Sequence, residues 1–196
     1  LTSPGRMPAG EYRLEVALLD SAAQAIPATE IWRAEPTEKV IAGPLYLADW
    51  PLVTTPPAMP HVPNVLFGNA VRLWGFDIQG DARPGQTLGV TLVWYSEGQL
   101  EQDYHVFVHL IDAQGALLGQ SDGLPANWTR PTTGWRPGEY IKDEHTVLIP
   151  AEAAIGPVYL WVGLYSPDGS GRLPITNPLE GQPNDRLQLD ILVIKP

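Results

Sequence analysis

Residues 104–121, YHVFVHLIDAQGALLGQS, contain the pattern that decides the fold. Apolar, aromatic and β-branched residues dominate the first nine positions, and a short polar loop, residues 112–115, ends in Gly115 before a second apolar run begins. β-branched and aromatic residues favour strands, and a glycine at the end of such a loop supplies the positive φ of a hairpin turn. The stretch therefore predicts two antiparallel strands, residues 104–112 and 116–121, joined by a hairpin.

Similar apolar runs recur along the chain between glycines and prolines. The further predicted strands are residues 11–19, 39–47, 70–78, 86–95, 140–149, 157–165 and 186–194. The 19 glycines and 21 prolines in 196 residues would interrupt long helices, whereas short strands joined by turns tolerate them. The predicted fold class is all-β, an immunoglobulin-like or jelly-roll β-sandwich. Three tryptophans within these strands, Trp74, Trp94 and Trp161, are expected in the core.

The composition excludes several classes of protein. Twelve basic and 22 acidic residues give a net charge of −10, and an acidic surface repels phosphate backbones, so no nucleic-acid partner is expected. The chain has no cysteine and therefore no disulfide or thiolate metal site. No apolar run approaches the ~20 residues that span a bilayer, so we expect no membrane-spanning segment in this chain. Its opening residues, 1–5, are typical of a cut inside a longer polypeptide.

The chain also contains an internal repeat. Residues 10–19 align with residues 156–165, and residues 38–40 align with residues 185–187, with apolar positions in register. Between the two copies, residues 51–63 contain five prolines, which is typical of an extended linker. We interpret residues 1–50 as the closing strands of a preceding, partial β-module packed on the main domain, residues 51–63 as a linker and residues 64–196 as a complete β-sandwich. Packing in cis, packing in trans and chance similarity between two hairpins are all open.

Three motifs in the second half resemble a known family. They are DYHVFVHLIDAQG at residues 103–115, RPTTGWRPGE at residues 130–139 and LWVGLY at residues 160–165. Together with PAGEYRLEV at residues 8–16, they resemble the soluble C-terminal β-domains of large bacterial membrane glycosyltransferases of the protein-mannosyltransferase type. The resemblance covers roughly residues 65–195 and 8–20, and its motifs mark the fold more specifically than the function.

The resemblance implies an extracytoplasmic location and a role beside polyprenyl-linked sugar chemistry. It supplies no catalytic residue, because the membrane helices and catalytic carboxylates of those transferases have no counterpart in this chain. We therefore expect a noncatalytic module, although the parent polypeptide could be a glycosyltransferase.

Metal and hydrolytic chemistry are weakly supported. His105 and His109 are four residues apart in a predicted strand, a span of ~13 Å, which is too far to share one ion. The loop carboxylates of Asp112, Asp122, Asp143 and Glu144 form no recognisable catalytic pair. Residues 168–171, DGSG, resemble a calcium loop only faintly. We expect no catalytic residue, no metal and no cofactor.

The long connection at residues 122–136 is the strongest candidate binding region. Aromatic faces stack on sugar rings, while amide, carboxylate and guanidinium groups bind hydroxyls, and loops on a rigid scaffold often bear such groups. The predicted glycan-binding residues are Trp128, Trp135, Arg130, Asp122 and Asn127. The alternative is that Trp135 closes one end of the sandwich and Trp128 packs over the prolines of the loop.

The predicted function is that of a noncatalytic extracytoplasmic accessory module that binds a glycan and is associated with a membrane glycosyltransferase. One alternative is a structural or protein-interaction β-sandwich without a ligand, and another is a glycoside hydrolase. The expected partners are a glycan or another β-module, and the expected state is a monomer or a weak dimer.

Overall fold

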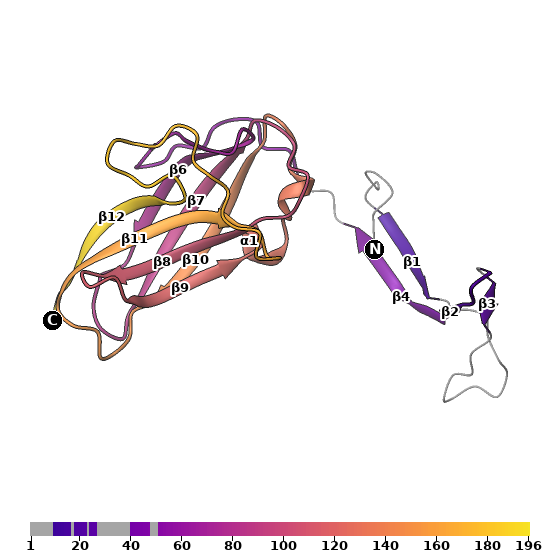
Figure 1. The fold of residues 1–196 in the computed structure, drawn as a ribbon, viewed down its shortest axis with the longest axis horizontal. Helices are drawn as coiled ribbons and strands as arrows, with labels where there is room; N and C mark the ends of the chain where they lie inside the picture. Colours follow the sequence, from indigo (N-terminus) through magenta and orange to yellow (C-terminus); the bar gives the residue numbers. More distant parts are fainter. Residues whose placement is uncertain (1–9, 17, 23, 27–39, 48–50) are drawn as a thin grey trace. The chain divides into compact units, whose positions relative to one another are not determined.

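A computed structural model describes residues 10–16, 18–22, 24–26, 40–47 and 51–196. The chain divides into two compact units, Leu1–Pro51 and Leu52–Pro196. The larger unit contains two four-stranded antiparallel sheets, with strand orders β10-β7-β6-β5 and β12-β11-β8-β9 (Figure 1). The predicted all-β sandwich is confirmed.

The strands of the larger unit match the sequence predictions within two residues at every end. The first sheet contains β5 (Val65–Phe67), β6 (Val71–Gln79), β7 (Thr87–Ser96) and β10 (Tyr140–Leu148). The second contains β8 (His105–Asp112), β9 (Leu117–Gly123), β11 (Gly156–Tyr165) and β12 (Leu187–Ile194). Only β5 was not predicted, because three residues are too few for a periodic pattern.

The predicted hairpin between β8 and β9 is confirmed. Gly115 has a φ of 87°, and its N–H donates to the carbonyl of Asp112 over 3.1 Å. The side chain of Asp112 also accepts hydrogen bonds from the N–H groups of Gln114 and Ala116. The aspartate therefore caps its own turn, as short polar residues commonly do.

Alternation of side chains builds the core. In β10 buried and exposed residues alternate from Ile141 to Leu148, and the buried ones face the second sheet. On the facing sheet, Val106, Val108 and Leu110 of β8 are fully buried, as is Leu160 of β11. These side chains join one continuous core cluster that includes both sheets.

Only one of the three tryptophans predicted in the core lies there. Trp94 is fully buried, whereas Trp74 and Trp161 are half-buried and lie outside the core cluster. In β11 the alternation that buries Leu160 and Val162 turns Trp161 to the outer face. The prediction was therefore wrong for Trp74 and Trp161, because the composition of a strand does not show which of its two faces points into the core.

A proline-rich segment lies along the outer face of the first sheet. The carbonyl of Val53 accepts a hydrogen bond from the N–H of Tyr140 (2.8 Å), and the carbonyl of Pro57 accepts one from Nε1 of Trp74 (3.4 Å). The carbonyl of His61 accepts one from the N–H of Phe76 over 2.9 Å. This segment therefore crosses from β10 over Trp74 to β6, where His61 pairs with Phe76.

The smaller unit contains two short antiparallel pairs. β1 (Gly10–Val16) pairs with β4 (Val40–Leu47), and β2 (Leu18–Leu19) pairs with β3 (Ala25–Ile26). The predicted strands 11–19 and 39–47 therefore correspond to β1 with β2 and to β4, except at residues 17 and 39, which lie outside the described residues. That residues 1–50 close a preceding module and pack on the main domain stays a prediction.

Candidate functional site

The outer face of the β12-β11-β8-β9 sheet gathers aromatic and polar side chains from three strands. In β8 the side chains of His105, Phe107 and His109 alternate with core residues and therefore point away from the interior. The strand register places Tyr165 of β11 opposite His105, and Asp122 of β9 opposite Phe107. Residues far apart in the sequence thus meet on one open sheet surface.

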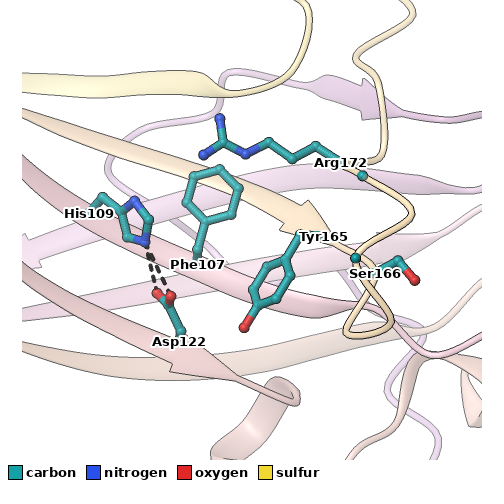
Figure 2. A pocket seen from close by; sticks show the side chains of 8 residues that line it. Phe107, His109, Asp122, Tyr165, Ser166 and Arg172 are labelled. Carbon is teal, nitrogen blue, oxygen red and sulfur yellow. Dashed lines mark hydrogen bonds and ion pairs between the residues drawn. The ribbon is translucent and has the colours of Figure 1, made fainter.

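These side chains surround a pocket of about 330 Å³. Figure 2 shows Phe107 between Tyr165 and the Arg172 side chain, with His109 and Asp122 beside it. The pocket is lined by Phe107, His109, Asp122, Tyr165, Ser166, Gly169, Gly171 and Arg172. The last four belong to the connection that follows β11, so a sheet face forms the floor and a loop forms one wall.

Two close approaches fix the Phe107 ring. A Cβ at Gly163, the residue opposite Phe107 in β11, would lie 2.5 Å from the ring, so only glycine leaves room for it. The guanidinium of Arg172 lies 4.5 Å from the ring centroid, within cation–π range. Asp185 holds Arg172 through a 2.6 Å ion pair. The arginine therefore covers the ring, and its charge remains at the pocket surface.

Hydrogen bonds orient the polar groups of the pocket. Nε2 of His109 lies 3.1 Å and 3.2 Å from the two carboxylate oxygens of Asp122. The hydroxyl of Tyr165 lies 3.2 Å from Nδ1 of His105. Burial raises the pKa of Tyr165 above its ordinary value, and the nearby Asp122 carboxylate raises it further. The phenol therefore stays protonated at neutral pH and can donate a hydrogen bond to a ligand.

A smaller hollow of about 50 Å³ adjoins the pocket, and Asp122 lines both. It is lined by Ser121, Asp122, Gly123, Leu124, Asn127, Trp128, Asp143, Glu144 and His145. Trp128 is 60% exposed and is the one exposed Phe, Tyr or Trp side chain among residues 51–196. Its indole lies over Gly123, where a Cβ would be 2.8 Å away, and its edge meets the ring of His105 at a centroid distance of 5.1 Å.

The turn that presents Trp128 has an unusual backbone. In α1 (Pro125–Trp128), Ala126, Asn127 and Trp128 have φ values of 52°, 54° and 68°. Each such residue costs ~1–2 kcal/mol when it is not glycine, because its Cβ crowds a backbone carbonyl. Three consecutive residues in this region are therefore strained, and strain of this kind concentrates at functional sites.

A buried carboxylate anchors this turn. Asp143 is 1% exposed, and its oxygens accept hydrogen bonds from the N–H of Ala126 (2.7 Å) and from Nε1 of Trp94 (3.1 Å). Nε2 of His145 lies 2.9 Å from the same carboxylate, and Nδ1 of His145 lies 3.1 Å from the hydroxyl of Ser121. The tautomer with a proton on Nε2 satisfies both contacts.

Ser121, His145 and Asp143 thus stand in the hydrogen-bonding order of a hydrolytic triad. The hollow beside them, about 50 Å³, is far smaller than the ~300–1,000 Å³ of ligand pockets. The carboxylate of Asp143 also accepts a hydrogen bond from the N–H of Ala126 in the turn. We therefore assign this series to holding the turn in place.

The structure brings together three of the five predicted glycan-binding residues. Asp122, Asn127 and Trp128 all line the small hollow. Trp135 is only 3% exposed, and its Nε1 donates to the carbonyl of Arg130 over 3.1 Å. Arg130 is 9% exposed and forms an ion pair with Glu139, which is fully buried. Trp135 and Arg130 are therefore withdrawn as ligand contacts, and the burial of Trp135 agrees with the alternative that it closes one end of the sandwich.

The candidate metal positions have other partners. His105 and His109 contact Tyr165 and Asp122 respectively, and residues 51–196 contain no cluster of three or more His, Asp or Glu side chains that could hold an ion. The carboxylate of Asp168 accepts hydrogen bonds from the hydroxyl of Ser166 and the N–H of Ser170. The Ser166 hydroxyl is the main reason why the pKa of Asp168 is lowered. Asp168 caps its own turn.

Sequence reasoning missed the main pocket. Phe107, Tyr165, Ser166 and Arg172 were not predicted, and His109 was considered only as a metal ligand. A usable signal was present in β8, where ring side chains occupy alternate positions while aliphatic residues occupy the others. This pattern indicates an aromatic outer face rather than a second buried one.

Comparisons with known proteins find a similar chain among solved structures alone. No family model matches the chain, and no curated protein matches it. Among solved structures, the C-terminal domain of Wzt is similar, with a TM-score of 0.48 and 12% sequence identity over 71% of this chain and 83% of that chain. Within the described ranges, no helix has the length and apolarity needed to cross a bilayer. The resemblance to mannosyltransferase-type domains stays a prediction.

Proposed function

We propose that the larger unit is a noncatalytic accessory module that binds a glycan on the outer face of its β12-β11-β8-β9 sheet. The observation that carries the proposal is the pocket of about 330 Å³, which an aromatic row connects to the exposed Trp128. In that row, the ring of His105 lies 5.3 Å from the ring of Tyr165 and 5.1 Å from that of Trp128.

The chemistry of the pocket fits a sugar. A pyranose ring has an apolar face of C–H groups and a rim of hydroxyls, so it needs aromatic contact and hydrogen-bonding partners at once. Tyr165 and Trp128 supply rings. Asp122 accepts hydrogen bonds, whereas Arg172 donates them, and both line the pocket. The volume falls at the lower end of the range for small-molecule pockets.

The cost of presenting Trp128 also supports a ligand. A tryptophan that is 60% exposed contributes little burial to folding. It is nevertheless held by three strained residues and by a buried carboxylate. The backbone strain of Ala126 and Trp128 alone amounts to roughly 2–4 kcal/mol, from ~1–2 kcal/mol per residue, whereas asparagine adopts this conformation more readily. A ligand contact at Trp128 would explain why this unfavourable conformation is kept.

The accessory role and its location rest on the sequence motifs. Residues 103–115, 130–139 and 160–165 resemble β-domains of bacterial membrane glycosyltransferases. From that resemblance we infer an extracytoplasmic module that positions a glycan near a transferase. Asp143, the buried carboxylate near Asp122, is occupied by three donors and is not available as a catalytic acid.

A protein-interaction module is the second candidate. Ile155, Ile191 and Val193 are each at least half exposed, and β12 is an edge strand. Exposed apolar residues beside a free strand edge favour pairing with another β-structure. This candidate predicts self-association in solution and no loss of function when the pocket is altered.

The proposal is tested with a glycan array of bacterial mono- to hexasaccharides, followed by calorimetric titration of the best ligand. We expect Trp128→Ala and Tyr165→Ala each to weaken binding at least about tenfold, which corresponds to about 1.4 kcal/mol. The matched control is Tyr159→Ala, because Tyr159 lies on the same face of the same strand, ~20 Å from Tyr165. Circular dichroism confirms folding of all variants. Absence of binding to every glycan, or equal binding by all variants, would refute the proposal.

A further inference from the structure

The hairpin in the smaller unit repeats the pairing of the last two strands of the sandwich. β1 with β4 and β11 with β12 each form seven antiparallel residue pairs, and each pairing skips one residue of the second strand. The end pairs are Gly10–Leu47 and Val16–Val40 in the first hairpin, and Gly156–Ile194 and Val162–Leu187 in the second. The sequence alignment of the repeat places these same positions opposite one another.

The connections at the tips of the two hairpins also agree. Leu19 pairs with Ala25 in the smaller unit, and Tyr165 pairs with Arg172 at the corresponding positions of the sandwich. The next residue donates its N–H across the loop in both: Asp20 to the carbonyl of Gln24 (2.9 Å), and Ser166 to the carbonyl of Gly171 (2.8 Å). The two hairpins therefore agree in pairing register, in which strand contains the bulge, and in the hydrogen bond that closes the loop. A chance similarity between two hairpins would not require all three features to agree.

The two hairpins differ in what lies beside them. β11 pairs on one edge with β12 and on the other with β8. Among the described residues, β1 pairs only with β4. An isolated two-stranded hairpin is marginally stable in water, and an unpaired strand edge attracts another strand. The edge of β1 that corresponds to the β8-facing edge of β11 therefore has no strand partner among the described residues.

We infer that this edge receives an antiparallel strand of the β8 type, supplied by strands equivalent to β5–β10 that lie in polypeptide outside these 196 residues. Residues 10–47 are then the closing hairpin of a second β-sandwich module. The expected partner strand has alternating aliphatic residues, like Val106, Val108 and Leu110 of β8, because these pack on the same layer as the core residues of β11.

The second module would lack two of the ligand groups of the first. Leu19 and Ala25 occupy the positions of Tyr165 and Arg172, so the phenol and the guanidinium have no counterpart there. Insofar as the proposed glycan function holds, the second module binds the glycan more weakly than the first. The inference about strand pairing does not depend on that function, and its test uses no glycan.

Hydrogen–deuterium exchange with mass spectrometry tests the pairing in the chain itself. Without partner strands, amides of residues 10–16 should exchange at least about a hundredfold faster than those of residues 156–162, because hairpin opening costs little free energy. Slow exchange of residues 10–16 at every protein concentration would overturn the inference. Protection that appears only at high concentration would also overturn it, since the partner would then be a second copy.

A fusion protein supplies the missing strands. In this fusion, a duplicate of residues 62–155, which contains β5–β10, replaces residues 1–9 and is followed directly by residues 10–196. We expect exchange of residues 10–16 to slow at least about a hundredfold. The matched control has Leu14→Asp, at the position that corresponds to the buried Leu160, and should stay unprotected. A fusion in which residues 10–16 remain as unprotected as in the control would refute the inference.

Discussion

Replacing Asp143 by asparagine tests whether the carboxylate holds the Trp128 turn. The aspartate accepts three hydrogen bonds, from the N–H of Ala126, Nε1 of Trp94 and Nε2 of His145. An asparagine has nearly the same shape but only one acceptor oxygen. If this oxygen keeps the bond to Ala126, the amide NH₂ faces the N–H of Trp94, and two donors oppose each other.

The expected cost follows from these contacts. Hydrogen bonds to a charged group contribute ~1.5–3 kcal/mol each, and a buried donor without a partner costs ~1–3 kcal/mol. Trp94 is fully buried, so water cannot replace the lost acceptor. Removal of one buried charge offsets part of the loss, because desolvation of the carboxylate is itself unfavourable. We therefore expect Asp143→Asn to lower the free energy of unfolding by about 3 kcal/mol.

Guanidinium unfolding followed by tryptophan fluorescence measures this change. Glu144→Gln is the matched control, since Glu144 is adjacent in β10 but exposed, and its ion pair with Lys142 is 2.8 Å long at the surface. Such pairs contribute less than about 1 kcal/mol. A loss for Asp143→Asn no larger than that of the control would refute the role assigned to the carboxylate.

Two further predictions concern the same face. Gly123→Ala adds a Cβ 2.8 Å from the indole of Trp128 and should displace this exposed ring, with a shift in tryptophan emission and at least about tenfold weaker glycan binding. The control is Gly134→Ala in the same connection, where the added Cβ meets open space and should change neither the emission nor the binding. Identical behaviour of the two variants would contradict the packing of Trp128 on Gly123. Tyr165→Phe tests the raised pKa of Tyr165: the folded state keeps the phenolic proton to higher pH than the unfolded chain, whose tyrosines titrate near about pH 10. The stabilising contribution is present below that pH and lost above it, so denaturant unfolding from about pH 8 to about pH 11 should show a smaller loss of stability for Tyr165→Phe than for the wild type, and parallel losses would contradict the prediction.

Much of the fold could be predicted because strand composition and turn chemistry agree locally. The hairpin around Gly115 illustrates this, since β-branched runs flank a loop that one aspartate caps. What composition does not contain is the direction in which each strand faces. Trp161 and Trp94 both stand in apolar runs, yet one lies on the outer face and the other in the core. Only the register with neighbouring strands decides between them.

The candidate site was only partly predictable for a similar reason. Asp122, Asn127 and Trp128 are close together in the sequence of one predicted loop, and all three line the small hollow. The main pocket joins Phe107 and Tyr165, which are 58 positions apart in the chain and meet only through the pairing of β8 with β11. Conversely, Arg130 and Trp135 lie in the expected loop but point inward. The guanidinium of Arg130 can be buried because the carboxylate of Glu139 pairs with it.

The left-handed turn at residues 126–128 separates two properties that are usually coupled. The position of the indole is determined by Asp143, which binds the N–H of Ala126 in the turn, and by Gly123, which lies against the ring. Which side chain is offered there is determined by residue 128, whose side chain is mostly in solvent. Exchange of Trp128 for tyrosine, histidine or arginine would therefore retune recognition without rebuilding the scaffold, so this position is a natural point for diversification by evolution or by design.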